Sequence, residues 1–243
     1  MAREHRIFSP SPLKAGAEVA LDEKGARHLV QALRLKSGDT CVLFDGSGRD
    51  FSATLTLAGK RGCRARVGEI LREEAPAALQ LRLVIGISRG ERMDFSIQKA
   101  VELGISGITP LFTERSMVNL RGERLRNRVE HWKGIIRHAS EQSGRSRLAE
   151  LHPPLTLVDW LAGFAGKGLM LDHRADTTLA SQPPPGKCLT LLVGPEGGLS
   201  RNERQQARGK GMQEVRLGPR ILRTETAPLA ALAVAQALWG DFR

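Results

Sequence analysis

Aromatic residues are scarce in this chain, which has no tyrosine and only 4% Phe, Trp and Tyr together. Domains that stack nucleic-acid bases on an aromatic platform, such as RRM and OB-fold domains, need several such rings on one surface. The composition argues against that mode of binding. Any contact with nucleic acid would then depend mainly on arginine side chains and on the backbone.

Cysteine is also scarce, with three residues far apart in the chain: Cys41, Cys63 and Cys188. An odd number at such spacing excludes a C-x-x-C metal or redox pair and is typical of reduced thiols in a cytosol. His131 and His138 share one predicted helix, but seven residues span about 10 Å along a helix, which is too far for one ion. We therefore expect no metal site.

Long apolar runs are missing. None approaches the roughly 20 residues that a membrane helix needs, and the stretch MAREHRIFSPSP at the N-terminus carries charge but no apolar segment of the secretory kind. We therefore expect a cytoplasmic protein with no membrane partner.

Positive charge, by contrast, is abundant, with 37 Lys and Arg against 26 Asp and Glu and a net charge of +11. A strongly basic protein tends to bind polyanions, because each neutralised phosphate releases counterions. The alternative is that a basic composition serves solubility alone or reflects a basic proteome.

Residues 1–73 predict a small β-rich module. Short alternating segments separated by turn residues indicate strands at 17–21, 41–48 and 51–58, with a hairpin turn at 45–48. One helix, residues 23–35, is expected between them from its apolar periodicity. Residues 71–79 resemble a linker.

From residue 80 the chain alternates between strand and helix patterns. We expect strands at 81–88, 105–112, 168–172, 188–194 and 213–218 and helices at 91–104, 121–143, 200 onward and 227–238. Ser200 with Glu203 three residues later forms a capping box for the third helix. Such alternation predicts a parallel sheet and an α/β class for this half of the chain.

The stretch LLVGPEGGLSRNE, residues 191–203, places three glycines around a Pro and a Glu directly after a strand. Glycine-rich turns of this kind commonly bind phosphate. Here, however, no Walker Lys-Ser or Lys-Thr pair follows, the G-x-G-x-x-G spacing is absent, and Glu196 would repel a pyrophosphate. The turn must hold a different ligand, or none.

Three loops follow strands in the second half: LDHRAD, GPEGGLS and LGPRILRTETA, which begin at residues 171, 194 and 217. In open α/β sheets, ligands bind at the carboxyl ends of strands, so these loops are the expected site. The third loop also reads as a helix start, with Thr226 as N-cap and Pro228 in the first turn. That interpretation leaves Arg223 and Glu225 unexplained.

These motifs carry a family resemblance. LLVGPEGGLS followed at about twenty residues by LGPRILRTETA resembles the bacterial 16S ribosomal RNA uridine-N3 methyltransferases of the SPOUT superfamily. The similarity continues through HLVQALRLKSGD with LFDGSG, through SRGERMDFSIQKAVELGISGITPLFTERS and through SEQSGR. It covers nearly the whole chain in the order of the family.

The resemblance implies a PUA-like RNA-binding β-barrel at 1–73 and a methyltransferase domain at 74–243, whose parallel sheet carries a trefoil knot. Chain physics alone predicts an unknotted sheet. The family uses S-adenosyl-L-methionine without a metal, acts on 16S ribosomal RNA of the small subunit, and works as a homodimer. The apolar final helix suits a dimer interface, although burial under the sheet would produce the same pattern.

The resemblance also assigns residues. Cofactor contacts are expected from Leu171, Gly194, Glu196, Gly197, Gly198, Leu217, Gly218, Ile221, Leu222 and Thr226. Glycines would allow the backbone to approach the cofactor closely. The loop LDHRAD departs from the His-Pro of relatives, since Arg174 follows His173, and its contacts stay open.

Methylation at N3 of uracil requires removal of the N3 proton or stabilisation of the resulting anion. Arg223 is expected to offset that anion. Glu225, Glu141 and Glu196 are candidate bases, and a salt bridge to a neighbouring arginine is the alternative for each. RNA contacts are expected from His28, Arg34, Arg89, Arg115, Gln142, Arg145 and Arg220.

Residues 115–147 hold nine Lys and Arg against three Glu, which indicates an RNA-backbone face or a solvated helix face. Gly144 would end the long helix. Two other functions stay open: the same chemistry on another base or RNA, and a non-catalytic RNA-binding or ribosome-assembly protein. Which uridine is modified, on free RNA or on the subunit, is not encoded in any motif.

Overall fold

The computed structural model describes residues 5–59, 62–118 and 120–242. The chain divides into two compact units: unit 1 is Met1–Pro76 with Arg137–Leu148, and unit 2 is Ala77–Ile136 with Ala149–Arg243. Residues 137–148, at the end of the long helix, thus group with the N-terminal residues. The sequence had suggested one division after residue 73.

Unit 1 is built on a mixed five-stranded sheet of order β1-β3-β4-β5-β2. The strands are β1 (Arg6–Phe8), β2 (Glu18–Ala20), β3 (Thr40–Phe44), β4 (Arg49–Gly59) and β5 (Gly62–Glu73). β1 pairs parallel with β3, and the other pairings are antiparallel. The predicted linker is wrong at its start, because residues 71–73 belong to β5, whose buried Cys63, Ala65 and Val67 alternate with exposed arginines.

The predicted helix at 23–35 is shorter and less regular than expected. It consists of α1 (Glu23–Arg27) and a π-helical turn, η1 (His28–Ala32). The wide turn places Leu29 in the core of unit 1, where it is fully buried. Arg34 follows with a positive φ of 57°, which few residues other than glycine adopt.

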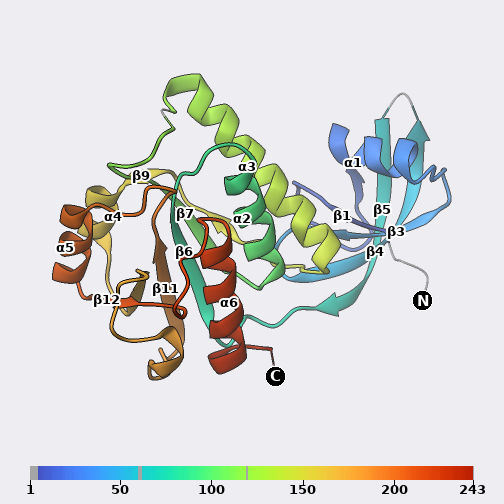
Figure 1. Ribbon diagram of the computed structural model, residues 1–243. Coiled ribbons are helices and arrows are strands. Elements are labelled where there is room, and N and C mark those ends of the chain that lie inside the picture. The colour runs from blue at the N-terminus through green and yellow to red at the C-terminus, as the bar shows by residue number, and fades with distance from the viewer. Residues whose placement is uncertain (1–4, 60–61, 119, 243) are drawn as a thin grey trace. The chain divides into compact units, whose positions relative to one another are not determined.

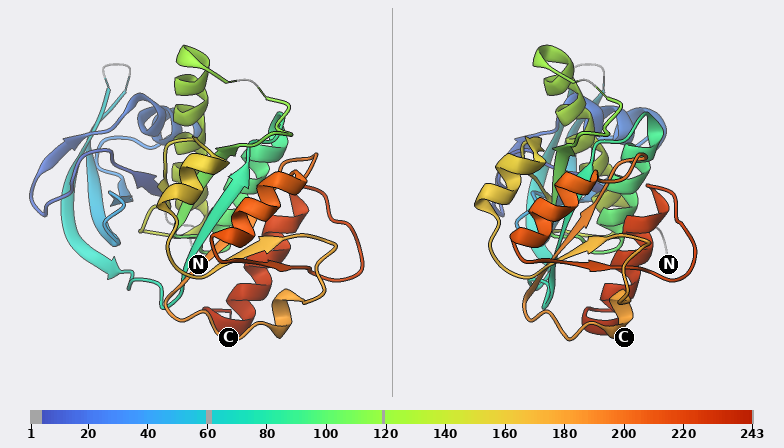
Figure 2. Two further views of the ribbon diagram at one scale, coloured as in Figure 1. Left: turned by 90° about the vertical axis from the view of Figure 1, so that its left-hand side faces the viewer. Right: turned by 60° about the vertical axis from the view of Figure 1, so that its left-hand side comes forward.

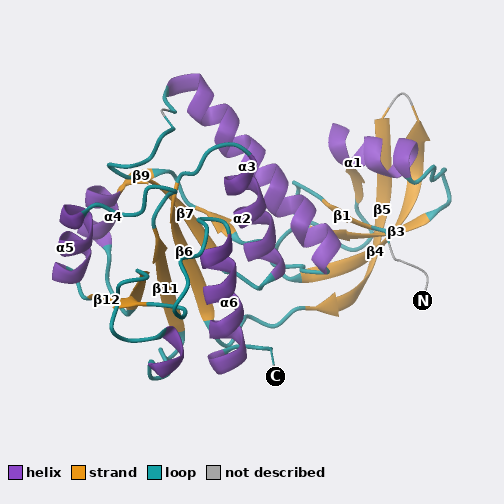
Figure 3. Cartoon of the chain, in the orientation of Figure 1, coloured by secondary structure: helices purple, strands orange, loops and turns teal. Residues whose placement is uncertain are grey.

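Unit 2 contains a seven-stranded sheet in which every pairing is parallel, as predicted (Figures 1 and 3). The order is β12-β10-β11-β6-β7-β8, with β9 also paired to β7. The strands are β6 (Gln80–Gly86), β7 (Gly107–Phe112), β8 (Glu150–Leu151), β9 (Leu155–Thr156), β10 (Gly168–Leu171), β11 (Cys188–Val193) and β12 (Met212–Val215). The α/β class of this half is confirmed.

Helices cover both faces of this sheet. They are α2 (Glu91–Glu102), α4 (Leu157–Gly163), α5 (Arg201–Gly209) and α6 (Thr226–Trp239), with a 3₁₀ turn η2 (Leu179–Ser181). The long helix α3 (Gly122–Ser143) begins in unit 2 and ends in unit 1. α4 and α5 pack on one face through a cluster that includes Val84, Leu192 and Met170. α6 packs with α2 on the other face, and Figure 2 shows α4 and α5 (yellow and orange) and α6 (red) on opposite sides of the sheet. The pattern had not predicted α4, β8, β9 or η2.

Local signals at helix ends were mostly accurate. Ser200 and Glu203 form the predicted capping box of α5, and α3 ends before Gly144, which has a φ of 77°. The predicted cap of α6 is wrong, because Thr226 is the first helical residue and Glu225 is the N-cap without a side-chain bond. The carbonyl of Arg223 instead accepts from the amides of Thr226 and Ala227, at 3.0 and 2.9 Å.

Among the residues described, no helix is long and apolar enough to cross a membrane.

Candidate active site

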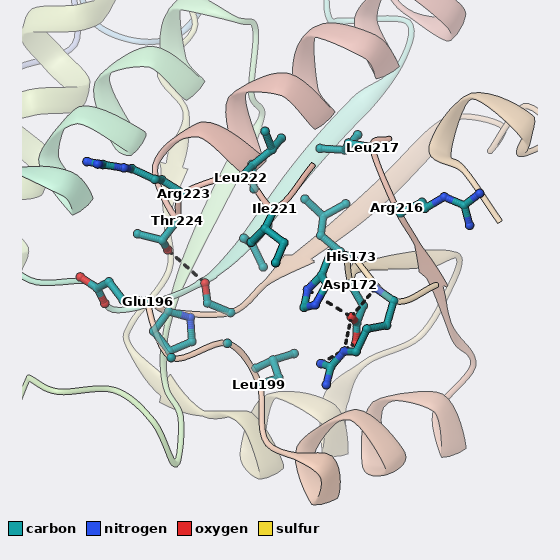
Figure 4. A pocket seen from close by; sticks show the side chains of 18 of the residues that line it. Asp172, His173, Glu196, Leu199, Arg216, Leu217, Ile221, Leu222, Arg223 and Thr224 are labelled. Atoms are coloured by element: carbon teal, nitrogen blue, oxygen red, sulfur yellow. Dashed lines mark hydrogen bonds and ion pairs between the residues drawn. The ribbon is translucent and has the colours of Figure 1, made fainter. Parts of the chain in front are cut away.

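The loops after β10, β11 and β12 meet at one edge of the unit 2 sheet. These strands are neighbours and parallel, so their carboxyl ends lie together. A cavity of about 460 Å³ lies between the loops (Figure 4), which is within the usual range for a small-molecule site. The first turn of α2, next to the end of β6, adds Arg92 to the lining.

Most of the predicted site residues of unit 2 line this cavity. They are Leu171, Gly194, Glu196, Gly197, Gly198, Leu217, Ile221, Leu222, Arg223, Glu225, Arg115 and Arg220. Among the described residues, Gly218, Thr226 and Arg89 are not part of the lining, although Arg89 contributes its amide to Glu196 at 2.9 Å. Ile221 is 75% exposed, so an apolar side chain stands open at the rim.

The glycines of GPEGG shape the loop itself. A Cβ on Gly194 would lie 2.8 Å from the amide of Leu199. Gly86 on β6 is equally confined, because a Cβ there would lie 2.5 Å from Cδ of Pro195. Gly194 is therefore needed so that the loop can fold back on itself, and Gly198 because its φ is 65°.

Two carboxylates of the cavity lining, Glu196 and Glu225, face one arginine, Arg92. Arg92 Nη1 donates to Glu196 Oε1 at 3.2 Å, and its Nε lies 4.0 Å from Glu225 Oε2. Oε2 of Glu196 and Oε2 of Glu225 are buried and have no hydrogen-bond partner among the described residues. Burial acts to raise the pKa of Glu196, but hydrogen bonds from the Arg89 amide and Arg92 outweigh it and hold the pKa below its ordinary value.

The loop LDHRAD, which sequence reasoning left open, is organised by Asp172. This buried carboxylate accepts from Arg174 Nε at 2.9 Å and Nη2 at 3.1 Å, and from Arg204 Nη1 at 2.7 Å. Burial acts to raise the pKa of Asp172, but these bonds lower it to about 2. The carboxylate therefore stays ionised, and the exposed His173 beside it lines the cavity.

Arg223 and Thr224 lie side by side in the LGPRILRTETA loop but have different surroundings. Thr224 Oγ1 donates to the Gly194 carbonyl at 3.2 Å and lies 3.3 Å from Ser88 Oγ, which ties the second and third loops together. The Arg223 side chain is exposed and extends away from Leu217 and Ile221 in Figure 4. It is therefore open to a large substrate at the cavity mouth.

The other predicted site residues belong to unit 1: His28, Arg34, Glu141, Gln142 and Arg145. Glu141 Oε1 accepts from the Phe8 amide at 3.0 Å, and Oε2 lies 3.4 Å from His138 Nδ1. The Arg145 carbonyl accepts from Arg6 Nη2 at 3.1 Å. The Glu141 carboxylate thus has a structural bond to β1 within unit 1.

Sequence reasoning missed Arg92, Arg204 and Arg216 in the lining and left the contacts of Asp172 and Arg174, in the LDHRAD loop, open. Arg204 is separated from Asp172 by 32 residues, so no local spacing connects them. Arg92 lies a few residues after the end of β6, and ligands of parallel sheets bind near such strand ends. That position could have indicated Arg92 as a lining residue. Among the residues described, no group of three or more His, Cys, Asp or Glu could hold a metal ion.

The fold and the cavity define a class: an α/β enzyme with a small-molecule site at its strand ends, joined to a β-rich unit. The model of an RNA methyltransferase domain matches residues 75–236, and that of an RNA methyltransferase PUA domain matches residues 21–68. The chain belongs to this RNA methyltransferase family.

Individual proteins agree with the family models. A ribosomal RNA small subunit methyltransferase E of Neisseria gonorrhoeae bound to S-adenosyl methionine is 38% identical, with a TM-score of 0.94 over 99% of this chain and 100% of that chain. A Legionella pneumophila structure in complex with SAM is 34% identical, also with a TM-score of 0.94 over 99% and 100%. A ribosomal RNA small subunit methyltransferase E of Buchnera aphidicola is 30% identical over 97% of each chain.

Proposed function

We propose that this protein transfers a methyl group from S-adenosyl-L-methionine to N3 of a uridine in 16S ribosomal RNA of the small subunit. The observation that carries the proposal is the cavity between GPEGGLS and LGPRILRTETA, on a fold that matches SAM-bound structures at 34% and 38% identity. The match to a small subunit methyltransferase E supports the choice of RNA.

The cavity is chemically suited to this cofactor. Leu171, Leu217 and Leu222 provide apolar walls for an adenosyl group. Each of Glu196 and Glu225 has a buried oxygen that accepts no hydrogen bond from the described residues, which favours a ligand that carries positive charge and N–H donors. S-adenosylmethionine meets both demands, and when bound it supplies an activated methyl group on its sulfonium.

We assign two further steps to residues of the cavity lining: acceptance of the N3 proton and stabilisation of the charge on uracil. Glu225 has a buried oxygen without a hydrogen-bond partner in the cavity and is our candidate for accepting the N3 proton. Glu196 is a weaker base, because its pKa lies below the ordinary value. Arg223, exposed at the mouth, would stabilise negative charge on the uracil oxygens.

RNA contacts are proposed for unit 1 and for the basic segment at 115–147. Arg34 is exposed and held in a left-handed conformation directly after the π turn that contains His28, and such strained positions often serve function. Arg115, Arg220, Arg89, Gln142 and Arg145 complete the proposed contacts, and Glu141 stays a second candidate base.

The resemblance further supports a PUA-like barrel in unit 1, a trefoil knot formed by the loops around the cavity, a homodimer and a cytoplasmic location. Sedimentation equilibrium of the full chain tests the dimer, since a monomer at micromolar concentration contradicts it.

The test of function is transfer of labelled methyl to small ribosomal subunits that lack the modification, with naked ribosomal RNA beside them. Nuclease mapping and mass spectrometry identify the product, and a single N3-methyluridine is the expected result. Methyl on another base, or on another RNA only, replaces the substrate assignment. Failure to bind the cofactor favours the non-catalytic RNA-binding alternative.

A further inference from the structure

The Asp172 cluster contains two arginines that line the cavity, and each has a guanidinium nitrogen without a described partner. Arg174 uses Nε and Nη2 on Asp172, and Arg204 uses Nη1 on Asp172 and Nε on the Ser200 carbonyl. Arg174 Nη1 and Arg204 Nη2 have no bond to any residue that the structure describes. Both residues line the cavity.

The Asp172 cluster also carries an excess of positive charge. Two guanidinium groups share one carboxylate, so the group carries a net charge of about +1 when Asp172 is ionised. The Arg204 side chain is only 16% exposed. It is also fixed by Asp172, so binding an anion there would cost little further ordering.

The other cationic side chains of the cavity are less suited to an anion. Arg92 is engaged by Glu196 and lies near Glu225, Arg115 Nη1 donates to the Gly197 carbonyl, and Arg216 Nη1 donates to the Ala175 and Asp176 carbonyls. Arg220 and Arg223 also line the cavity, but both side chains are exposed and no described residue fixes their guanidinium groups, so an anion would have to order them. The cavity therefore has one pole with two carboxylates and another with two arginines around Asp172.

We propose that Arg174 and Arg204 bind the carboxylate of the methionyl tail of the cofactor through these open nitrogens. The proposal rests on the proposed function and adds to it which end of the cavity receives the tail. Asp172 acts as a positioning residue that aligns both guanidinium groups. Bonds between ionised partners of this kind are stronger than neutral ones.

The test compares S-adenosylmethionine with its decarboxylated analogue, which keeps the adenosyl group, the sulfonium and the amine. Calorimetry on the full-length protein would measure Kd for both ligands in the wild type, Arg174→Gln and Arg204→Gln. Arg201→Gln, on the same helix as Arg204 but outside the cavity lining, is the matched control.

We expect the wild type to prefer S-adenosylmethionine by roughly tenfold or more, as one charge-assisted contact supports. Each cavity variant should lose about tenfold in affinity for S-adenosylmethionine and less than about threefold for the analogue. The control should keep both affinities. The preference for the carboxylated ligand thus disappears only when Arg174 or Arg204 is changed.

Three results would overturn the proposal. Equal binding of the two ligands by the wild type removes the carboxylate site but leaves the proposed function intact. Parallel loss of both ligands in the variants means a damaged cavity instead of a lost contact. Binding of neither ligand by the wild type removes the proposed function itself. If Arg204→Gln does not fold, Arg174→Gln decides, because that side chain is 54% exposed and leaves Asp172 paired with Arg204.

Discussion

Each unit contains a buried aspartate held by two arginines, and the two clusters differ in what happens to the remaining donors. In unit 1, Asp50 accepts from Arg6, from Arg72 Nε at 3.0 Å and from Ser146 Oγ at 2.6 Å. In unit 2, Asp172 is held in the same way by Arg174 and Arg204.

The difference lies in the second nitrogen of each guanidinium. Arg6 Nη2 donates to the Arg145 carbonyl and Arg72 Nη2 to the Gly144 carbonyl, so both arginines of unit 1 fasten the segment after α3 to the sheet. In the Asp172 cluster, Arg204 Nε donates to the Ser200 carbonyl at 3.4 Å, whereas Arg174 Nη1 and Arg204 Nη2 have no partner among the described residues. The same ion-pair arrangement thus holds two segments together where its arginines also bind the backbone after α3, and forms a candidate ligand site where its arginines line a cavity.

The largest expected effect comes from removing the Asp50 carboxylate, which binds Arg6 and Arg72 in unit 1. The Asp50 side chain is only 5% exposed. Asp50→Ala would leave the charges of Arg6 and Arg72 without this buried carboxylate, which should lower the free energy of unfolding by about 3–5 kcal/mol. Urea unfolding followed by circular dichroism measures it. A loss below about 1 kcal/mol would mean that the cluster is held by its surroundings.

Separating binding from chemistry in unit 2 is the next test. Arg223→Ala should keep the affinity for S-adenosylmethionine and lose about 10²-fold in single-turnover methyl transfer, because its proposed contact is with the charge that develops on uracil. Arg201→Ala serves as the control. Near wild-type transfer by the Arg223 variant would remove Arg223 from the catalytic group.

The Asp172 cluster should leave a signature in the pH dependence of stability. A folded pKa of about 2 against an ordinary 3.8 means that the ionised carboxylate stabilises the fold above about pH 4, and that this contribution disappears as the pH falls through 2. The advantage of the wild type over Asp172→Asn should therefore grow from near zero at pH 2 to about 2 kcal/mol at pH 5. Denaturant titrations at each pH measure the difference, and a pH-independent difference would contradict the assigned shift.

The smallest expected effect tests whether Arg34, which has no ion-pair partner among the described residues, binds RNA. Arg34→Gln should weaken RNA binding a few-fold and make the dependence on salt shallower by about one unit of log–log slope. Arg27, which is paired with Glu23 at 2.7 Å, provides the comparison through Arg27→Gln. Equal slopes for Arg34→Gln and wild type would exclude a phosphate contact at Arg34.

Sequence reasoning succeeded where the signal is local. The capping box at Ser200 and Glu203 depends on residues three apart, and the parallel sheet follows from alternation of strand and helix. It failed where contacts are distant or the backbone is irregular. The π turn at His28–Ala32 has the same apolar periodicity as a helix, and the cap of α6 is a backbone turn that Thr226 does not reveal.

The glycine-rich loop illustrates both cases. Its place at the end of β11 was predictable from the pattern, and so was its approach to the LGPRILRTETA loop. The physical role of Gly194 was not, because the atoms that exclude a side chain there belong to Leu199 and Gly198 in the folded loop.

The sequence by itself determined the chemical inventory: a basic chain, an α/β second half, and three strand-end loops whose motifs identify the family. These features depend on residue type and short-range periodicity, which the amino-acid sequence contains without any knowledge of the fold. Only the tertiary structure decided which charges meet. Arg204 on α5 donates a hydrogen bond to Asp172, and Arg92 donates one to Glu196. Glu141 accepts a hydrogen bond from the amide of Phe8, which is 133 residues away in the sequence. Such pairs form because packing of the sheet and helices brings distant segments together, and the desolvation of each buried charge then requires a partner.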